Sequence, residues 1–183
     1  MTIMKASNIS VFILFCAMVW CSSSSAQIIT SGSLSVLKDQ QQVNMICDFE
    51  NCTVDKHNID HARYIHRDWD KGVEEIVIRF AEGYNDKANS KYYCKFGNYP
   101  EAEYTLVYHL IDIDDDQDTK GTIDILNTKT QKVLVHIEKA NGSAGTFGSF
   151  FNLLGDAFEN LGKKLGKLSK KSPSPEKVEW ISI

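Results

Sequence analysis

The sequence predicts an α+β fold in which an antiparallel β-meander sheet is packed by a central helix (about 68–86) and a long C-terminal helix (about 147–170). Three observations support this. Short segments rich in Val, Ile, Tyr and Thr follow one another after residue 90, and two separate stretches place apolar residues at helical spacing. The helices precede and follow the run of strands, which distinguishes this order from a doubly wound parallel fold.

The strand segments alternate apolar and polar residues or are rich in β-branched and aromatic residues. The connections between the later strands are short, with "DDDQDTK" and "NTKTQ" as turn sequences, so consecutive strands are expected to be antiparallel neighbours. The expected strands are residues 32–37, 41–49, 91–96, 102–113, 121–126 and 132–140.

The central helix is predicted from an apolar stripe on one helical face. Asp68 or Asp70 can cap its start, Gly83 with Asn85 can end it, and one or two earlier helical turns are expected at about 59–65. The stripe consists of Trp69, Val73, Ile76, Val77, Phe80, Ala81 and Tyr84.

The C-terminal helix has an unbroken apolar seam but contains several glycines, each of which costs about 1 kcal/mol relative to Ala in a helix interior. Gly148, Gly155 and Gly162 form a line about 100° from the seam, and a line without side chains allows a close neighbour. We expect that neighbour to be the sheet of the same domain; a membrane surface and a second copy of the helix are the alternatives. The seam consists of Phe147, Phe151, Leu154, Phe158, Leu161, Leu165 and Leu168.

Residues 1–26 have the features of a secretory signal peptide: Lys5, an apolar run, and small residues before Gln27. The predicted protein is therefore exported, to the periplasm or beyond, with one α+β domain at 27–171 and a Pro-containing tail at 172–183. A lipid anchor on Cys21 is the less favoured alternative, because Trp20 precedes it where bacterial lipidation sites usually have a small residue.

Charge and cysteine content exclude some classes of function. The chain has 20 basic and 24 acidic residues, and loss of Lys5 makes the mature net charge about −5. Nucleic-acid binders need a basic surface, so that class is not expected. Three cysteines remain after residue 26, and Cys47 with Cys52 is a possible disulfide, although Cys94 could pair with either and all three could be free buried thiols.

Two groups of residues are weak candidates for metal binding. His57 and His61 are four apart and would share one side of a helix. Asp112, Asp114 and Asp116 resemble the start of a calcium loop, but the Gly and the bidentate Glu of an EF-hand are missing. Solvated histidines and a solvated hairpin tip are the simpler explanations, so no metal, cofactor or catalytic residue is assigned.

The chain resembles small uncharacterised exported proteins of Bacteroidetes in the Ala26-Gln27 cleavage site, in "ILNTKTQKVL" and in "GTFGSFFNLLGDAFENLGKKLGK". More distantly, the order of its elements is similar to α+β domains of envelope-assembly lipoproteins, such as the curli-channel and cell-wall-synthase-activator families. Those domains are interaction modules, so the resemblance implies binding.

The leading functional hypothesis is a non-catalytic, exported domain that binds a protein or another component of the envelope or extracellular space. Two alternatives are a metal-dependent hydrolase and a protein that lies on a membrane through its C-terminal amphipathic helix.

Overall fold

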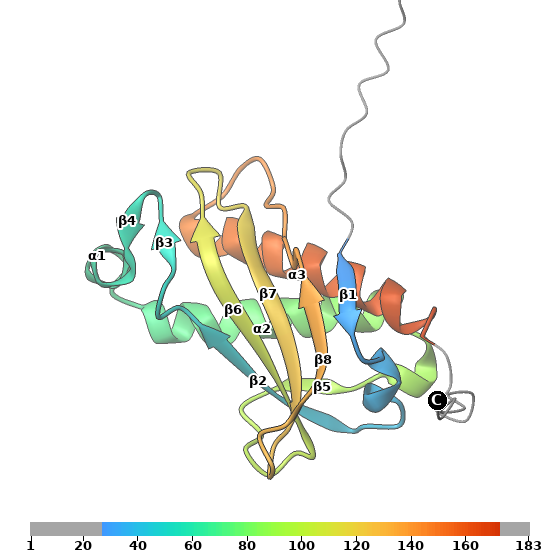
Figure 1. Ribbon diagram of the computed structural model, residues 1–183. Coiled ribbons are helices and arrows are strands. Elements are labelled where there is room, and N and C mark those ends of the chain that lie inside the picture. Colours follow the sequence, from blue (N-terminus) through green and yellow to red (C-terminus); the bar gives the residue numbers. More distant parts are fainter. Residues whose placement is uncertain (1–26, 173–183) are drawn as a thin grey trace, which may run out of the picture.

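A computed structural model describes residues 27–172 of the chain. The predicted signal peptide, the alternative anchor site Cys21 and all but the first residue of the predicted tail lie outside these residues. The described part is α+β, as predicted: a sheet of eight strands is packed on one side by two long helices (Figure 1).

The sheet is mixed, with the strand order β1-β8-β7-β6-β2-β5, and a short β3–β4 pair is attached to the end of β6. The strands β6, β7 and β8 form the predicted antiparallel meander. The bounds of the strands are β1 Ile28–Ser31, β2 Gln42–Asp48, β3 Thr53–Val54, β4 His57–Asn58, β5 Lys95–Gly97, β6 Tyr104–Ile113, β7 Thr119–Asn127 and β8 Val133–Glu138.

The prediction of a purely antiparallel sheet was wrong at β2. This strand lies between β5 and β6 and is parallel to both, with Asn44 opposite Gly97 on one side and Thr105 on the other. The chain leaves β2, passes through a long helix and returns to the same sheet, which is the crossover that parallel neighbours require. As a result β5 and β6, although consecutive, do not pair with each other.

The prediction of a strand at 32–37 was also wrong. Residues Leu34–Leu37 form a short 3₁₀ helix, η1, and the edge strand β1 lies just before it. Leu34 and Leu37 are both fully buried. They are three residues apart, so one turn of 3₁₀ helix points both into the core, whereas a strand would point them to opposite faces. Likewise, the first two residues of the strand expected at 91–96 belong to a second 3₁₀ helix, η2 (Ser90–Tyr92), and only the last two belong to β5.

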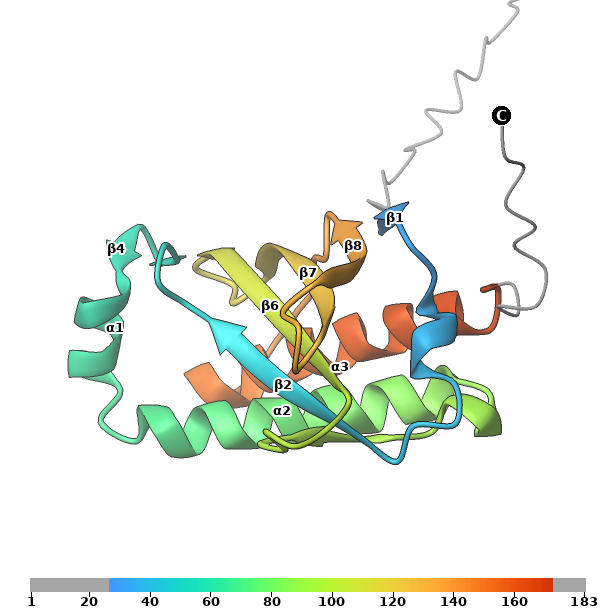
Figure 2. The same ribbon diagram turned by 60° about the horizontal axis from the view of Figure 1, so that its bottom comes forward.

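The helices agree closely with the prediction. Helix α1 spans Ile59–Ile65, α2 spans Trp69–Lys87 and α3 spans Phe150–Ser169. Gly83 does not end α2 but lies buried inside it. Both α2 and α3 lie against one face of the sheet, side by side, and the opposite face carries no helix (Figure 2).

The glycines of α3 face α2 and not the sheet, which corrects the expected neighbour. A Cβ atom on Gly162 would lie 2.2 Å from the carbonyl oxygen of Phe80, and one on Gly166 would lie 2.3 Å from that of Tyr84. From the opposite side, a Cβ on Gly83 would lie 2.1 Å from the carbonyl oxygen of Glu159. The two helices thus run parallel with their backbones in contact, and the glycines are what permits this approach.

The apolar seam of α3 supplies much of the core. Leu154, Phe158, Leu161 and Leu165 are all fully buried, whereas Phe147 lies before the helix and is 93% exposed. The folded domain therefore has no free apolar face on α3 for a bilayer, contrary to the membrane alternative. In the described residues, no helix has the length and apolarity to span a membrane.

Candidate functional site

A row of alternating carboxylates and imidazoles crosses the uncovered face of the sheet. It consists of Asp48 on β2, His109 on β6, Asp124 on β7 and His136 on β8, and we call it the carboxylate–histidine row. The strand register brings the four together: Asp48 is directly opposite His109, and Asp124 is directly opposite His136. The alternation of side chains along each strand points all four away from the helices.

The row is held by short polar contacts. His109 Nδ1 lies 2.8 Å from Asp48 Oδ2, and His109 Nε2 lies 3.3 Å from Asp124 Oδ2. The second oxygen of Asp124 lies 2.5 Å from His136 Nδ1. Because carboxylate oxygens only accept hydrogen bonds, His109 donates to both aspartates only when both of its ring nitrogens are protonated.

The environment of Asp48 favours its ionised form. The backbone N–H of Glu50 donates to Asp48 Oδ1 at 3.0 Å, and this bond, together with the hydrogen bond from His109, holds the pKa of Asp48 below its usual range. Partial burial opposes this but is outweighed. One end of the row is therefore a fixed negative charge at neutral pH.

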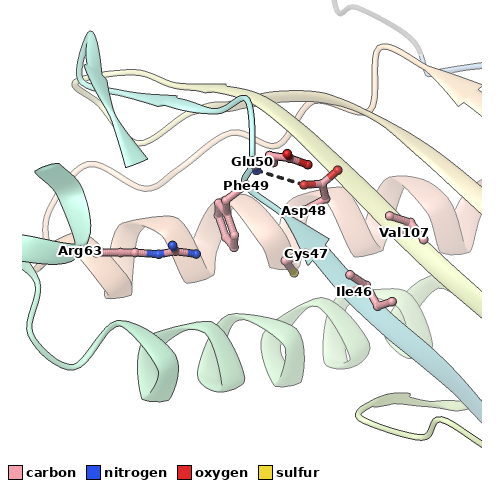
Figure 3. Close-up of a pocket in the computed structure, with 7 residues that line it drawn as sticks. All are labelled: Ile46, Cys47, Asp48, Phe49, Glu50, Arg63 and Val107. Atoms are coloured by element: carbon pink, nitrogen blue, oxygen red, sulfur yellow. Dashed lines mark hydrogen bonds between the residues drawn. The ribbon is translucent and has the colours of Figure 1, made fainter. Parts of the chain in front are cut away.

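A pocket of about 470 Å³ adjoins Asp48 at the end of β2 (Figure 3). Arg63 extends towards it from α1, opposite the acidic side chains of Asp48 and Glu50. Ile46 and Val107, which are paired neighbours on β2 and β6, line its apolar side. The pocket and the row together form the candidate site, which combines charges of both signs with exposed aliphatic surface.

Comparisons with known proteins assign no family to this chain. No protein-family model matches it, and no curated protein matches it. Its fold is similar to a PelC dodecamer from Paraburkholderia phytofirmans, with a TM-score of 0.44 and 11% identity over 77% of this chain and 96% of that one. A variant of that PelC has a TM-score of 0.43 and 11% identity, over 77% of this chain and 98% of that one. Protein XCC0632 from Xanthomonas campestris, family DUF330, has a TM-score of 0.32 and 9% identity, over 76% of this chain and 90% of that one. Scores this low say nothing about function.

The carboxylate–histidine pairs of the row resemble part of a serine-hydrolase triad. An aspartate that orients an imidazole is part of the serine-hydrolase triad, but the triad also needs a nucleophile bonded to the imidazole. Among the polar contacts of residues 27–172, the imidazole side chains of the row contact only aspartates of the row, and no nucleophile is bonded to them. The row is thus a set of hydrogen-bonded polar side chains on a surface, with the ionised Asp48 at one end, and it can form polar contacts with a partner.

The histidines predicted as a metal pair do come together. His57 on β4 and His61 on α1 have ring centroids 4.5 Å apart, although both are exposed. Asn58 caps α1 between them by accepting from His61 N–H, which sets their spacing. Within the described residues there is no group of three or more His, Cys, Asp or Glu suited to a metal, so a third protein ligand is not in place.

The three aspartates of the predicted calcium loop have separate roles at the β6–β7 hairpin. Asp112 accepts from Thr53 Oγ1 at 2.7 Å and from Lys120 Nζ at 2.8 Å. Asp114 Oδ1 accepts the backbone N–H groups of Asp116 and Asp118, which closes the turn. Asp116 is exposed at the tip. This arrangement matches the simpler explanation, a solvated hairpin tip.

Cys47, Cys52 and Cys94 are free thiols in the structure. Burial raises the pKa of each to about 12, so none is a ready nucleophile. The bond that the sequence allows between Cys47 and Cys52 is not formed here, and their pairing in an oxidising compartment stays a prediction.

The carboxylate–histidine row was missed by sequence reasoning. His109 and His136 can each be placed on strands from the sequence, and alternation puts His109 on the same side as Val107. No local sequence pattern indicates that β2 pairs with β6, and it is this pairing that places Asp48 opposite His109. The Asp124–His136 pair could have been found by assigning which residues of β7 and β8 lie opposite each other in their hairpin.

The depressed pKa of Asp48 predicts a pH-dependent contribution to stability. Since the folded pKa lies below the unfolded value of about 3.9, the ionised carboxylate stabilises the fold above that pH, and the contribution is lost as the pH falls through the folded pKa. Asp48→Asn should therefore be less stable than wild type at pH 7, and the difference should shrink in acid. Urea unfolding across this range measures it.

Asp115→Asn, at the exposed hairpin tip, controls for loss of one negative charge. A difference between Asp48→Asn and wild type that stays constant down to the lowest pH would contradict the assignment of Asp48 as the stabilised carboxylate.

Proposed function

We propose that this protein is an exported, non-catalytic interaction domain of a bacterial cell envelope or the extracellular space, and that it binds its partner through the uncovered face of its sheet. The observation that carries the proposal is the composition of that face. Ile46 and Ile111 are 47% and 57% exposed there, on either side of the hydrogen-bonded side chains of the carboxylate–histidine row.

Protein interaction surfaces combine exposed apolar side chains with polar and charged ones. On the opposite side of the sheet, α2 and α3 bury the corresponding strand positions, such as Leu106 and Ile125, completely. The open face thus exposes aliphatic side chains whose burial by a partner would be favourable, and the ionised Asp48 in the row adds a charge that can help to select that partner.

The test is cross-linking followed by capture from the native host, with three baits. The first is the mature chain, the second carries Ile46→Glu and Ile111→Glu on the open face, and the third carries Ile78→Glu on α2. Ile78 is 55% exposed and lies on α2, away from the open face, so it controls for the effect of a carboxylate at an exposed isoleucine. A partner retained by the first and third baits and lost by the second supports the proposal.

A partner captured equally by all three baits would exclude the open face as the binding surface. If only the Ile78→Glu bait failed to capture the partner, the binding surface would lie on the α2 side of the molecule. Circular dichroism of each bait confirms that the added carboxylates leave the fold intact, as expected for substitutions at exposed positions.

A metal-dependent hydrolase is the second candidate, and the contact between His57 and His61 is the observation that favours it. Two imidazoles can hold Zn²⁺ only with further ligands from water, substrate or a partner. Stoichiometric zinc in the purified protein, lost in His57→Ala, would favour this candidate over the interaction domain.

A further inference from the structure

One end of the molecule is basic although the chain as a whole is acidic, with a formal net charge of −4. Four segments that are distant in sequence meet there: η1, the end of α2, η2 and the end of α3 (Figures 1 and 2). We call this surface the lysine end. It consists of Lys38, Lys87, Lys91, Lys167, Lys170 and Lys171.

Specific contacts hold these segments together. The N–H of Asp39, just after η1, donates to the carbonyl of Lys91 in η2 at 2.6 Å. The close approach of Gly166 to Tyr84 and Ala88 sets the last turns of α3 beside the end of α2. The lysine end is therefore a rigid part of the fold.

The charge of the lysine end is largely uncompensated. Lys91, Lys167, Lys170 and Lys171 are exposed and form no ion pair with any residue of the described range 27–172. Lys87 pairs with Asp86 at 2.8 Å. Within the described residues, this is the one ion pair that any of the six lysines forms.

The opposite end of the molecule has the reverse charge. The β6–β7 hairpin tip carries aspartates at 112, 114, 115, 116 and 118, and Lys120 is bonded to one of them. Figure 1 shows this tip and the end of α3 at opposite ends of the fold. The hairpin tip and the lysine end therefore carry opposite charge, an asymmetry that can orient the protein in the field of a charged surface.

We propose that the lysine end docks the folded protein on a bilayer that contains anionic phospholipids. The charges are spread over four segments and are all lysines, whose compact ammonium groups on flexible stems suit a diffuse layer of headgroups; a single phosphate or carboxylate would be better bound by the fork of an arginine. The acidic tip is repelled by the same surface and points away from it. In this orientation the open face of the sheet is left accessible.

The test measures sedimentation of the mature chain with vesicles of phosphatidylcholine that contain phosphatidylglycerol, and with vesicles of phosphatidylcholine alone. We expect binding to the anionic vesicles only, weakened by salt. The triple variant Lys167→Glu, Lys170→Glu and Lys171→Glu should lower the partition coefficient at least about a hundredfold, since each lysine near such a surface contributes about fivefold.

The matched control is Lys56→Glu, Lys71→Glu and Lys129→Glu, three exposed lysines outside the lysine end, which changes the net charge by the same amount. It should retain most of the binding. The neutral triple Lys167→Gln, Lys170→Gln and Lys171→Gln serves if the glutamate variant fails to fold, and should lose binding less steeply.

Three results would overturn the proposal: no sedimentation of the wild type with anionic vesicles, equal binding to neutral vesicles, or equal loss in the control triple. Displacement from the vesicles by low concentrations of inorganic phosphate would also overturn it, since that would indicate a discrete anion site. The partner proposed for the open face plays no part in this assay, so the two proposals fail independently.

Discussion

Gly162→Ala is expected to lower the free energy of unfolding by about 2–3 kcal/mol, even though Ala is the better helix former by about 1 kcal/mol. The added methyl group would lie 2.2 Å from the carbonyl oxygen of Phe80 and 2.8 Å from the backbone nitrogen of Tyr84. Backbone atoms inside a helix cannot move aside singly, so α2 and α3 must separate. Urea unfolding measures the loss.

Gly155→Ala is the matched control within the same glycine line. Its methyl group would meet Arg79 Cδ at 2.8 Å, which is part of a flexible, partly exposed side chain. Arg79 must shift while it keeps its contacts with Asp156 and Glu159, and the gain in helix propensity offsets much of that cost. We expect a change below about 1 kcal/mol in either direction. Equal destabilisation by the two substitutions would contradict the helix–helix contact described above.

Phe158→Ala is expected to cost about 3–5 kcal/mol, or to abolish cooperative unfolding altogether. Phe158 is fully buried, and its ring packs edge-on against Tyr108 at a centroid distance of 5.4 Å. The truncation leaves a cavity where α3 meets the sheet. Differential scanning calorimetry should show a much lower midpoint and unfolding enthalpy.

Phe147→Ala tests the same seam at a position that the fold leaves exposed. The two phenylalanines belong to one heptad pattern, but Phe147 is 93% exposed, and its removal should change stability by less than about 0.5 kcal/mol. If the seam served self-association or a bilayer instead of the core, the two substitutions would have similar small effects on the stability of the monomer. That outcome would reject the packing of α3 under the sheet.

Prediction from the sequence was most accurate where a regular pattern extends over many residues. The helices α2 and α3 and the strands β2, β6, β7 and β8 lie where periodicity and turn residues placed them. It failed where the segments are short. Leu34 and Leu37 of η1 and Tyr92 of η2 lie in segments predicted as strands. In so short a segment, the spacing of apolar residues fits a single 3₁₀ turn as well as a strand.

The candidate site shows the same division. His57 and His61 come close together, as expected from the sequence, but not through the predicted helical spacing of four, since His57 lies on β4 and only His61 on α1. The carboxylate–histidine row joins four strands, and its contacts span up to 61 residues of sequence, so no local pattern carries it. The lysine end is intermediate, since the basic end of α3 is visible in the sequence but its meeting with η1, α2 and η2 is not.

The sequence by itself determined the α+β class, the two long helices and the meander, because periodic burial of side chains is encoded residue by residue. Only the tertiary structure decided that β2 inserts in parallel between β5 and β6, that α3 packs its glycines on α2, and that one sheet face stays open. The reason is that local sequence shows which helix face or strand edge must be buried or paired. Which other element buries or pairs it depends on how the whole chain packs together.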